Sequence, residues 1–129
     1  MAPYDINREA REVARDSNFE QMMWYAWYVI SENMPADQRD DIKSGIEDLV
    51  NAARVYHFAD QRIYEMKLTS FVLIMDDIHY KLARDRDTFE SYTQLLTDCM
   101  QALVDNDLID ANPMAQLRVD PGYYSKYWP

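Results

Sequence analysis

The sequence predicts an all-α fold: a single compact bundle of five to six helices with an aromatic C-terminal tail. Three observations favour it. The chain has 129 residues, 48% of them hydrophobic, which is enough to bury a core without disulfides or metals. It has only two glycines, whereas a sheet protein with many tight turns needs more. Apolar residues recur at helical spacing in several segments. No linker divides the chain, so residues 1–129 are expected to form one domain, with 120–129 as its tail.

The helix predicted for the centre of the bundle covers about residues 60–84, with Asp60 as its cap. Residues 68–75 carry no charge, and a broad apolar stripe widens there to most of the circumference. The stripe consists of Ile63, Phe71, Ile74, Met75, Ile78 and Leu82. A helix of this kind belongs in a core with neighbours on several sides. Charges at Lys67 and Asp76 leave the apolar run too short to cross a membrane.

Two helices are predicted at the start of the chain. The first is short and covers residues 6–15, with Asp5 placed to cap it. The stretch from Ser17 to Glu20 has the form of a capping box, so a second helix is expected over about residues 18–33.

A third helix is predicted over about residues 36–57, with Pro35 placed before it. Its apolar positions step by four, three, four and three, at Ile42, Ile46, Leu49, Ala53 and Tyr56. Gly45 lies within this helix at a cost of about 1 kcal/mol relative to alanine. We therefore expect a close approach by a neighbouring backbone at that position.

The remaining elements follow the central helix. Asp87 to Glu90 resembles a capping box and opens a fifth amphipathic helix that ends near Asp105. A final short helix is expected to begin at Pro113. Residues 120–122 have the composition of a turn before the aromatic tail.

The formal charge of −10 is unevenly distributed. Residues 1–59 carry 11 acidic and 6 basic side chains and residues 87–129 carry 7 and 2, whereas residues 60–86 carry 5 of each. Direct binding to nucleic acid is disfavoured, because phosphate contacts need clustered lysine and arginine. A protein with a basic or nucleic-acid-binding surface is the partner that this charge favours.

The residue types that carry chemistry are few. Asp76 and His79 are three apart on one helix, but the second copy needed for a di-iron bundle is missing, since Arg54 stands three residues before His57. Cys99 lies on an apolar stripe and is interpreted as a small buried hydrophobe. The sequence predicts no enzyme, no metal and no cofactor. With one cysteine, no signal-peptide pattern and no membrane span, a reducing cytoplasm is the expected location.

Three groups of residues are candidates for partner binding. Aromatic side chains on the second helix, opposite its main apolar face, are either packed between neighbours or exposed as a patch. Acidic side chains line the polar side of the third helix, and aromatic side chains fill the tail. The tail either folds back on its own domain or docks on a second subunit or a target. The residues are Trp24, Tyr25 and Tyr28; Asp37, Asp41 and Asp48; and Tyr123, Tyr124, Tyr127 and Trp128.

The function expected from this character is non-enzymatic binding to another protein. A small acidic helical chain fits an inhibitor or adaptor of the kind that phages and mobile elements encode against host defence proteins that handle nucleic acid. Its acidic faces would act as a DNA mimic, or its aromatic residues would carry the binding, and the sequence favours the aromatic residues slightly. A small-molecule sensor with a pocket of methionine and tyrosine, and an immunity protein against a basic toxin, are the alternatives. Self-association as a homo-oligomer through the tail is a further expectation.

Overall fold

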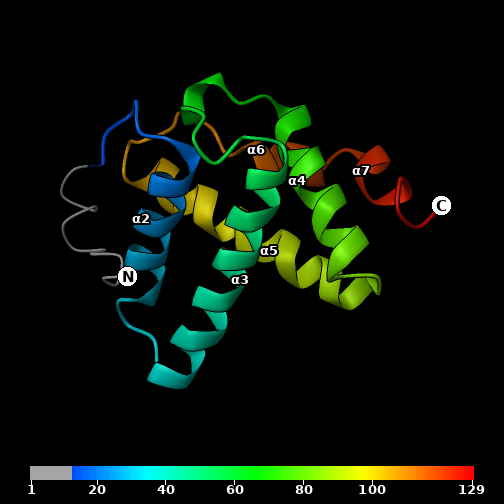
Figure 1. Cartoon of the computed structure of the whole chain (residues 1–129), viewed down its shortest axis with the longest axis horizontal. Helices are drawn as coiled ribbons and strands as arrows, with labels where there is room; N and C mark the ends of the chain where they lie inside the picture. The colour runs from blue at the N-terminus through cyan, green and yellow to red at the C-terminus, as the bar shows by residue number, and fades with distance from the viewer. Residues whose placement is uncertain (1–12) are drawn as a thin grey trace.

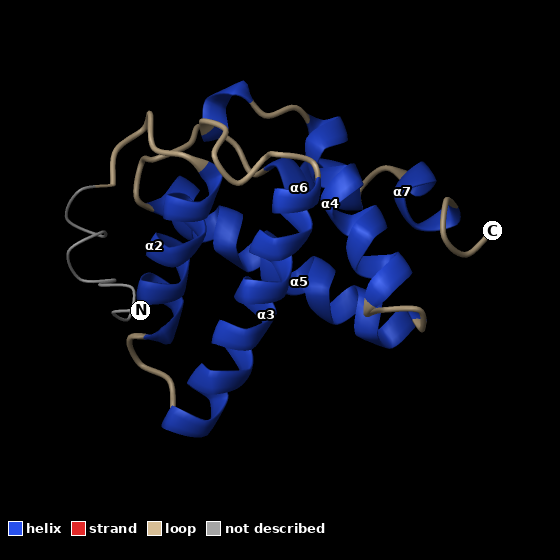
Figure 2. Ribbon diagram, viewed as in Figure 1, coloured by secondary structure: helices blue, strands red, loops and turns tan. Residues whose placement is uncertain are grey.

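The computed structural model describes residues 13–129, and over this range every regular element is helical (Figure 2). The one β-type pairing there is an isolated bridge between Asn18 and Arg62. The all-α prediction is therefore confirmed. Most of the predicted first helix, residues 6–12, lies outside the described residues, and residues 13–15 are not helical.

Six α-helices and one 3-10 turn follow one another between residues 13 and 129. They are α2 (Phe19–Ser31), α3 (Ala36–Val55), the 3-10 turn η1 (Ile63–Glu65), α4 (Leu68–Lys81), α5 (Arg86–Asp105), α6 (Pro113–Arg118) and α7 (Pro121–Ser125). Helices α2 and α3 lie side by side, and α5 crosses behind them to reach α4 (Figure 1). The short helix α6 packs against α4 and α5, and α7 follows it beyond α4, beside the C-terminus (Figure 1). Over the same residues no helix is both long and apolar enough to cross a bilayer.

A capping box starts α2 one residue later than the sequence predicts, with Asn18 and Gln21 in the places expected for Ser17 and Glu20. The Asn18 side chain accepts a 2.8 Å hydrogen bond from the backbone N–H of Gln21, and the Gln21 side chain accepts one of 2.9 Å from the N–H of Asn18. This reciprocal pair satisfies two of the backbone donors that a helix start leaves open. The helix ends at Ser31, two residues before its predicted end.

A left-handed residue ends α3 two residues before its predicted end. His57 has a φ of 61°, and the N–H of Phe58 reaches back to the carbonyl of Ala53 at 2.9 Å. This is the hydrogen-bond pattern of a Schellman motif, which glycine usually forms.

The predicted helix over residues 60–84 is shorter than expected. Residues 60–67 form a loop that contains η1, and α4 begins only at Leu68. At this helix start, the Ser70 hydroxyl accepts a hydrogen bond from the N–H of Lys67. The cause is a tertiary contact. The carbonyl of Gln61 accepts from Phe19 and the N–H of Ile63 donates to Ser17, so this backbone is paired with the entry to α2 and cannot continue a helix. Asp60 therefore caps no helix.

The core forms where α5 meets the other helices. Helix α5 packs against α2, α3, α4 and α6, whereas α4 packs against α3, α5 and α6. Helix α4 buries Phe71, Ile74, Met75 and Ile78 of the predicted stripe. Ile63 is buried in η1, whereas Leu82, just after the end of α4, is 50% exposed, so the predicted burial of Leu82 is wrong. The largest fully buried residues are Phe19, Phe89, Met22, Met23, Ile46, Leu49, Ile74, Met75, Ile78, Leu96, Met100 and Leu103. Helix α5 thus shares the central position that the sequence assigns to α4 alone.

Aspartates cap the starts of two helices in the C-terminal third of the chain. Asp85 caps α5 by accepting from the N–H of Thr88 at 2.9 Å, and this hydrogen bond lowers the pKa of the Asp85 carboxyl. The predicted cap at Asp87 is therefore two residues late. Asp120 accepts from the N–H of Gly122 at 2.9 Å and opens α7, so the stretch expected to be a turn starts a short helix instead.

Candidate protein-binding surfaces

Helix α3 separates its charges onto two sides. Its three basic residues all engage α2: Arg39 donates to the carbonyl of Glu32, Lys43 lies over the ring of Trp27, and Arg54 pairs with Glu20, as the hydrogen bonds and ring contact show. At about 100° per residue, these three positions fall on one flank of the helix.

The predicted acidic row lies on the opposite flank of α3. Asp37, Asp41 and Asp48 are spaced by four and seven residues, so their side chains share one side of the helix. Asp37 and Asp41 are exposed and Asp48 is half-buried. Because the basic residues of α3 are engaged with α2, this row keeps its negative charge without a cation from its own helix.

A groove of about 300 Å³ runs between this row and α5. Its lining contains two carboxylates and no basic residue: Asp41, Ile42, Ser44, Gly45, Asp48, Ser91, Tyr92 and Leu95. Gly45 allows the two helices to meet here, since a Cβ on Gly45 would stand 2.5 Å from Cδ2 of Leu95. The close neighbour expected at Gly45 is thus a side chain and not a backbone.

A hydrogen bond between the helices fixes one wall of the groove. The Tyr92 hydroxyl donates to Oδ2 of Asp48 at 2.7 Å. Partial burial and the bond to this carboxylate together raise the pKa of Tyr92 to about 12. Near neutral pH the phenol of Tyr92 therefore keeps its proton and remains a hydrogen-bond donor.

The aromatic residues of α2 do not form the exposed patch that was one alternative. Trp24 is only 8% exposed and belongs to the core, and Tyr25 is half-buried against it. Tyr28, at 37% exposed, is the most accessible of the three. Helix α2 packs against both α3 and α5, which is why it buries more than one face.

The tail folds back on its own domain. The hydroxyl of Tyr123 shares a 3.0 Å hydrogen bond with the hydroxyl of Thr93, and both residues are buried. The hydroxyl of Tyr127 and the ammonium of Lys126 both donate to the Asp76 carboxylate on α4. Of the alternatives for the tail, the fold-back on its own domain is the one observed.

Two further tail residues complete this attachment. Arg118, at the end of α6, pairs with Glu90 on α5 and donates from Nε to the hydroxyl of Tyr124 at 3.2 Å. The ring of Trp128 lies 5.0 Å from that of Phe89 between centroids. Tyr124 and Trp128 are half-buried, so neither stands free in solvent.

Aromatic rings surround His79. Ring centroids of Tyr127, Trp128 and Phe89 lie 4.9, 5.3 and 5.8 Å from the imidazole. Within residues 13–129, no group of three or more metal-ligating side chains comes together. Cys99 is fully buried, and that burial raises the pKa of its thiol well above the usual range. A buried neutral thiol is inert as a nucleophile.

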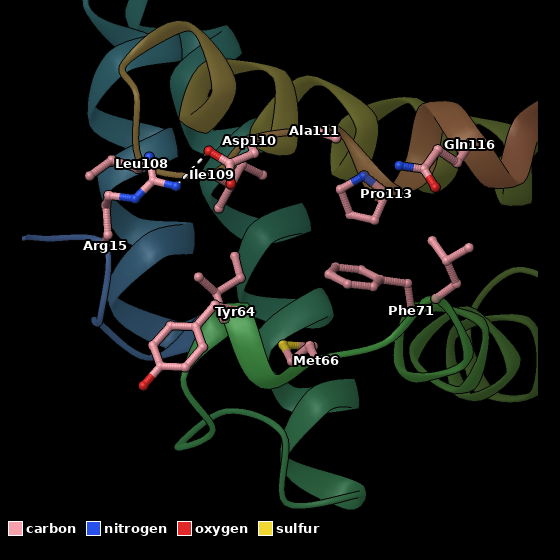
Figure 3. Close-up of a pocket in the computed structure, with 12 residues that line it drawn as sticks. Arg15, Tyr64, Met66, Phe71, Leu108, Ile109, Asp110, Ala111, Pro113 and Gln116 are labelled. Carbon is pink, nitrogen blue, oxygen red and sulfur yellow. Dashed lines mark hydrogen bonds and ion pairs between the residues drawn. The ribbon is translucent and has the colours of Figure 1, made fainter.

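A larger cavity of about 490 Å³ lies between η1, the start of α4 and the segment that joins α5 to α6 (Figure 3). Its walls are mostly apolar, and Arg15 and Asp110 stand at one end. The full lining is Arg15, Ile63, Tyr64, Met66, Leu68, Phe71, Leu108, Ile109, Asp110, Ala111, Pro113 and Gln116. Sequence periodicity could not locate this cavity, because its walls come from four separate segments.

The chain matches no protein-family model, and neither the curated proteins nor the solved structures include a match to it. Its own residues therefore carry every functional argument. Of the ten predicted binding residues, Asp37, Asp41 and Tyr28 remain exposed, and the others are half-buried or buried. The groove residues Ser91, Tyr92 and Leu95 were not among the candidates, because the apolar spacing of α5 indicates only a core-facing stripe.

Proposed function

We propose that this protein is a non-enzymatic binding module. It binds another protein through the acidic side of α3 and acts as its inhibitor or as an adaptor. The single observation that carries the proposal is that the basic residues of α3 lie on the side opposite its row of Asp37, Asp41 and Asp48. Its basic residues are engaged with α2, and its acidic row lines or flanks a groove that contains no basic residue.

The groove has the chemistry to receive a basic side chain. Ile42, Leu95 and the ring of Tyr92 offer apolar surface for the methylene stem of an arginine or lysine. Asp41 and Asp48 supply carboxylates for its charged end, and the planar guanidinium of arginine suits such acceptors best. A partner with a basic surface that normally contacts nucleic acid phosphates is the class of protein that this arrangement favours.

The acidic mode now has more support than the aromatic mode. Trp24 and Tyr123 belong to the core, and Tyr127 is bonded to Asp76. Hot-spot residues must be accessible before the partner arrives, and these three are committed to the fold. The biological setting that size and charge suggest is a phage or mobile element that acts against host defence.

The test is a pulldown from a lysate of the native host, read by mass spectrometry. We compare the wild-type chain with the double variant Asp37→Lys/Asp41→Lys, which leaves the Asp48–Tyr92 bond intact. The wild type is expected to retain a basic partner at low salt and release it as salt rises, because exposed charges are screened within about 10 Å at 0.1 M. The double variant is expected to lose that partner.

The matched control is Asp16→Lys/Asp60→Lys, which changes the net charge equally at two exposed acids in loops outside the groove. It should retain the partner. If both double variants lose the partner equally, net charge and not the α3 row is responsible. If neither loses it, the acidic mode is wrong.

A further inference from the structure

The cavity beside η1 is lined mostly by apolar residues and is open along one side. Phe71 and Met66 lie at its walls, and the Phe71 ring projects into the gap below the segment 108–113 (Figure 3). Tyr64 and Leu68 line the same cavity yet are 61% and 41% exposed. A small molecule is usually enclosed over most of its surface, and this shape leaves one side uncovered. It is better suited to a side chain whose own backbone would cover the opening.

The charge around the cavity differs between its two sides. Asp105 is the last residue of α5, and Asp107 and Asp110 follow it with no basic residue among them. The last turn of α5 has no basic residue either. Arg15 is the cation that the structure places there. It donates to the carbonyl of Asp107 at 2.8 Å and pairs with the Asp110 carboxylate.

The segment 105–110 therefore keeps a net negative charge beside an apolar cavity. The negative end of the α5 dipole adds to that potential. On the opposite rim, Arg62 donates to the hydroxyl of Tyr64 at 3.2 Å, which places a positive charge on that side. These opposite charges would orient a bound peptide segment so that its cation lies near Asp110 and away from Arg62.

We propose that this cavity is a second docking point for the partner protein, which inserts an aromatic or large aliphatic side chain with an arginine or lysine next to it. The apolar side chain fills the space between Met66, Phe71 and Leu108. The adjacent cation joins Arg15 at the carboxylate of Asp110, whose side chain is 87% exposed and has room for both. This inference rests on the proposed function, since it supplies an apolar contact to a partner already expected to be basic. Buried aromatic anchors of this kind carry much of the binding energy at interfaces.

The test uses two dipeptides that share the anchor and differ in charge, N-acetyl-Trp-Arg-amide and N-acetyl-Trp-Glu-amide. Each is titrated into the whole chain, and binding is followed by NMR at the methyl groups of Met66 and Leu108. Both dipeptides are expected to bind weakly. The arginine dipeptide should bind about two- to fivefold more tightly at low salt, the range that one exposed ion pair supports.

Two variants with matched controls locate the site. Asp110→Asn should remove the preference for arginine, whereas Asp41→Asn, in the groove between α3 and α5, should leave it unchanged. Ala111→Phe should block both dipeptides, because Ala111 lines the cavity at an exposed position. Ala115→Phe, at an exposed position of α6 outside the lining, should block neither.

Three results would overturn the proposal. The first is that neither dipeptide shifts the Met66 and Leu108 methyl signals up to about 10 mM, a concentration that detects even very weak binding. The second is equal binding of the two dipeptides, or binding that Ala111→Phe does not alter. The third is tighter binding of 4-phenylbutyrate than of either dipeptide, which would make the cavity a small-molecule site. Because these titrations use the free chain, their failure is distinct from failure of the α3 pulldown.

Discussion

The phenol of Tyr92 on α5 and the carboxylate of Asp48 on α3 are joined by a 2.7 Å hydrogen bond, although 44 positions separate them in the sequence. The bond joins α5 to α3 at one wall of the groove that we assign to partner binding, since both residues line it. Partial burial beside this carboxylate also raises the pKa of Tyr92 to about 12. The same contact therefore links the proposed site to the stability of the fold.

The free energy of unfolding should fall as pH rises from about 10 to 12. An unfolded tyrosine loses its proton near pH 10, whereas Tyr92 in the folded chain keeps it to about pH 12. A pKa raised by folding contributes stability that is present below the unfolded value and lost through the folded one. Urea unfolding at several pH values measures this slope.

Tyr92→Phe is the matched variant for that measurement. It should cost about 1 kcal/mol near neutral pH through the lost hydrogen bond and should show a shallower alkaline decline. Some decline should persist, because burial also raises the pKa values of Tyr123 and Tyr127 above the usual range. An identical slope in the variant and the wild type would show that Tyr92 is not the group responsible.

Truncation after Gly122 should destabilise the chain without changing its oligomeric state in solution. It removes Tyr123, which is buried and bonded to Thr93, and the two donors to Asp76. Loss of a large buried aromatic costs about 3–5 kcal/mol. Chemical unfolding measures the loss and light scattering the mass, with Val119→Ser, at an exposed position just before α7, as a control for changes near the tail. If the whole chain is an oligomer and the truncated chain is a monomer, the tail instead joins copies of the chain.

Phe71→Ala should cost about 3–5 kcal/mol by leaving a space in the core. Phe71 is buried, and its ring meets that of Phe19 edge-on at 6.2 Å between centroids. Leu73→Ala, on the exposed side of the same helix, is the control and should cost much less. A loss below about 1 kcal/mol for Phe71→Ala would contradict the packing of α4 described above.

Zinc should leave the melting temperature unchanged. His79 is enclosed by the rings of Phe89, Tyr127 and Trp128, none of which is a zinc ligand. Thermal melts with and without added zinc test this, with His79→Ala melted in parallel. Stabilisation by zinc that disappears in His79→Ala would reveal a metal site.

Several features of the fold depend on short-range signals, and these the sequence predicts well. A capping box starts α2 within one residue of the predicted position, although it uses Asn18 and Gln21 and not Ser17 and Glu20. The start of α6 follows from Pro113 together with the Asn112 cap. The burial of Phe71 and Ile78 follows from helical periodicity, because an apolar stripe must face other helices.

Other features depend on contacts between distant segments, and local pattern does not contain them. The predicted helix over residues 60–84 is interrupted because Gln61 and Ile63 pair with the entry to α2. Trp24 is buried because α2 packs against both α3 and α5. The spacing of apolar residues within α2 does not determine how many helices surround it.

The candidate site divides in the same way. The sequence alone determines that Asp37, Asp41 and Asp48 share one side of a helix, because the period of the α-helix fixes which residues lie together. Only the tertiary structure decides that the basic residues of α3 turn to α2 and that Tyr92 meets Asp48. Side chains on separate helices meet according to how those helices pack, and that packing minimises the free energy of the whole core and not of any one segment.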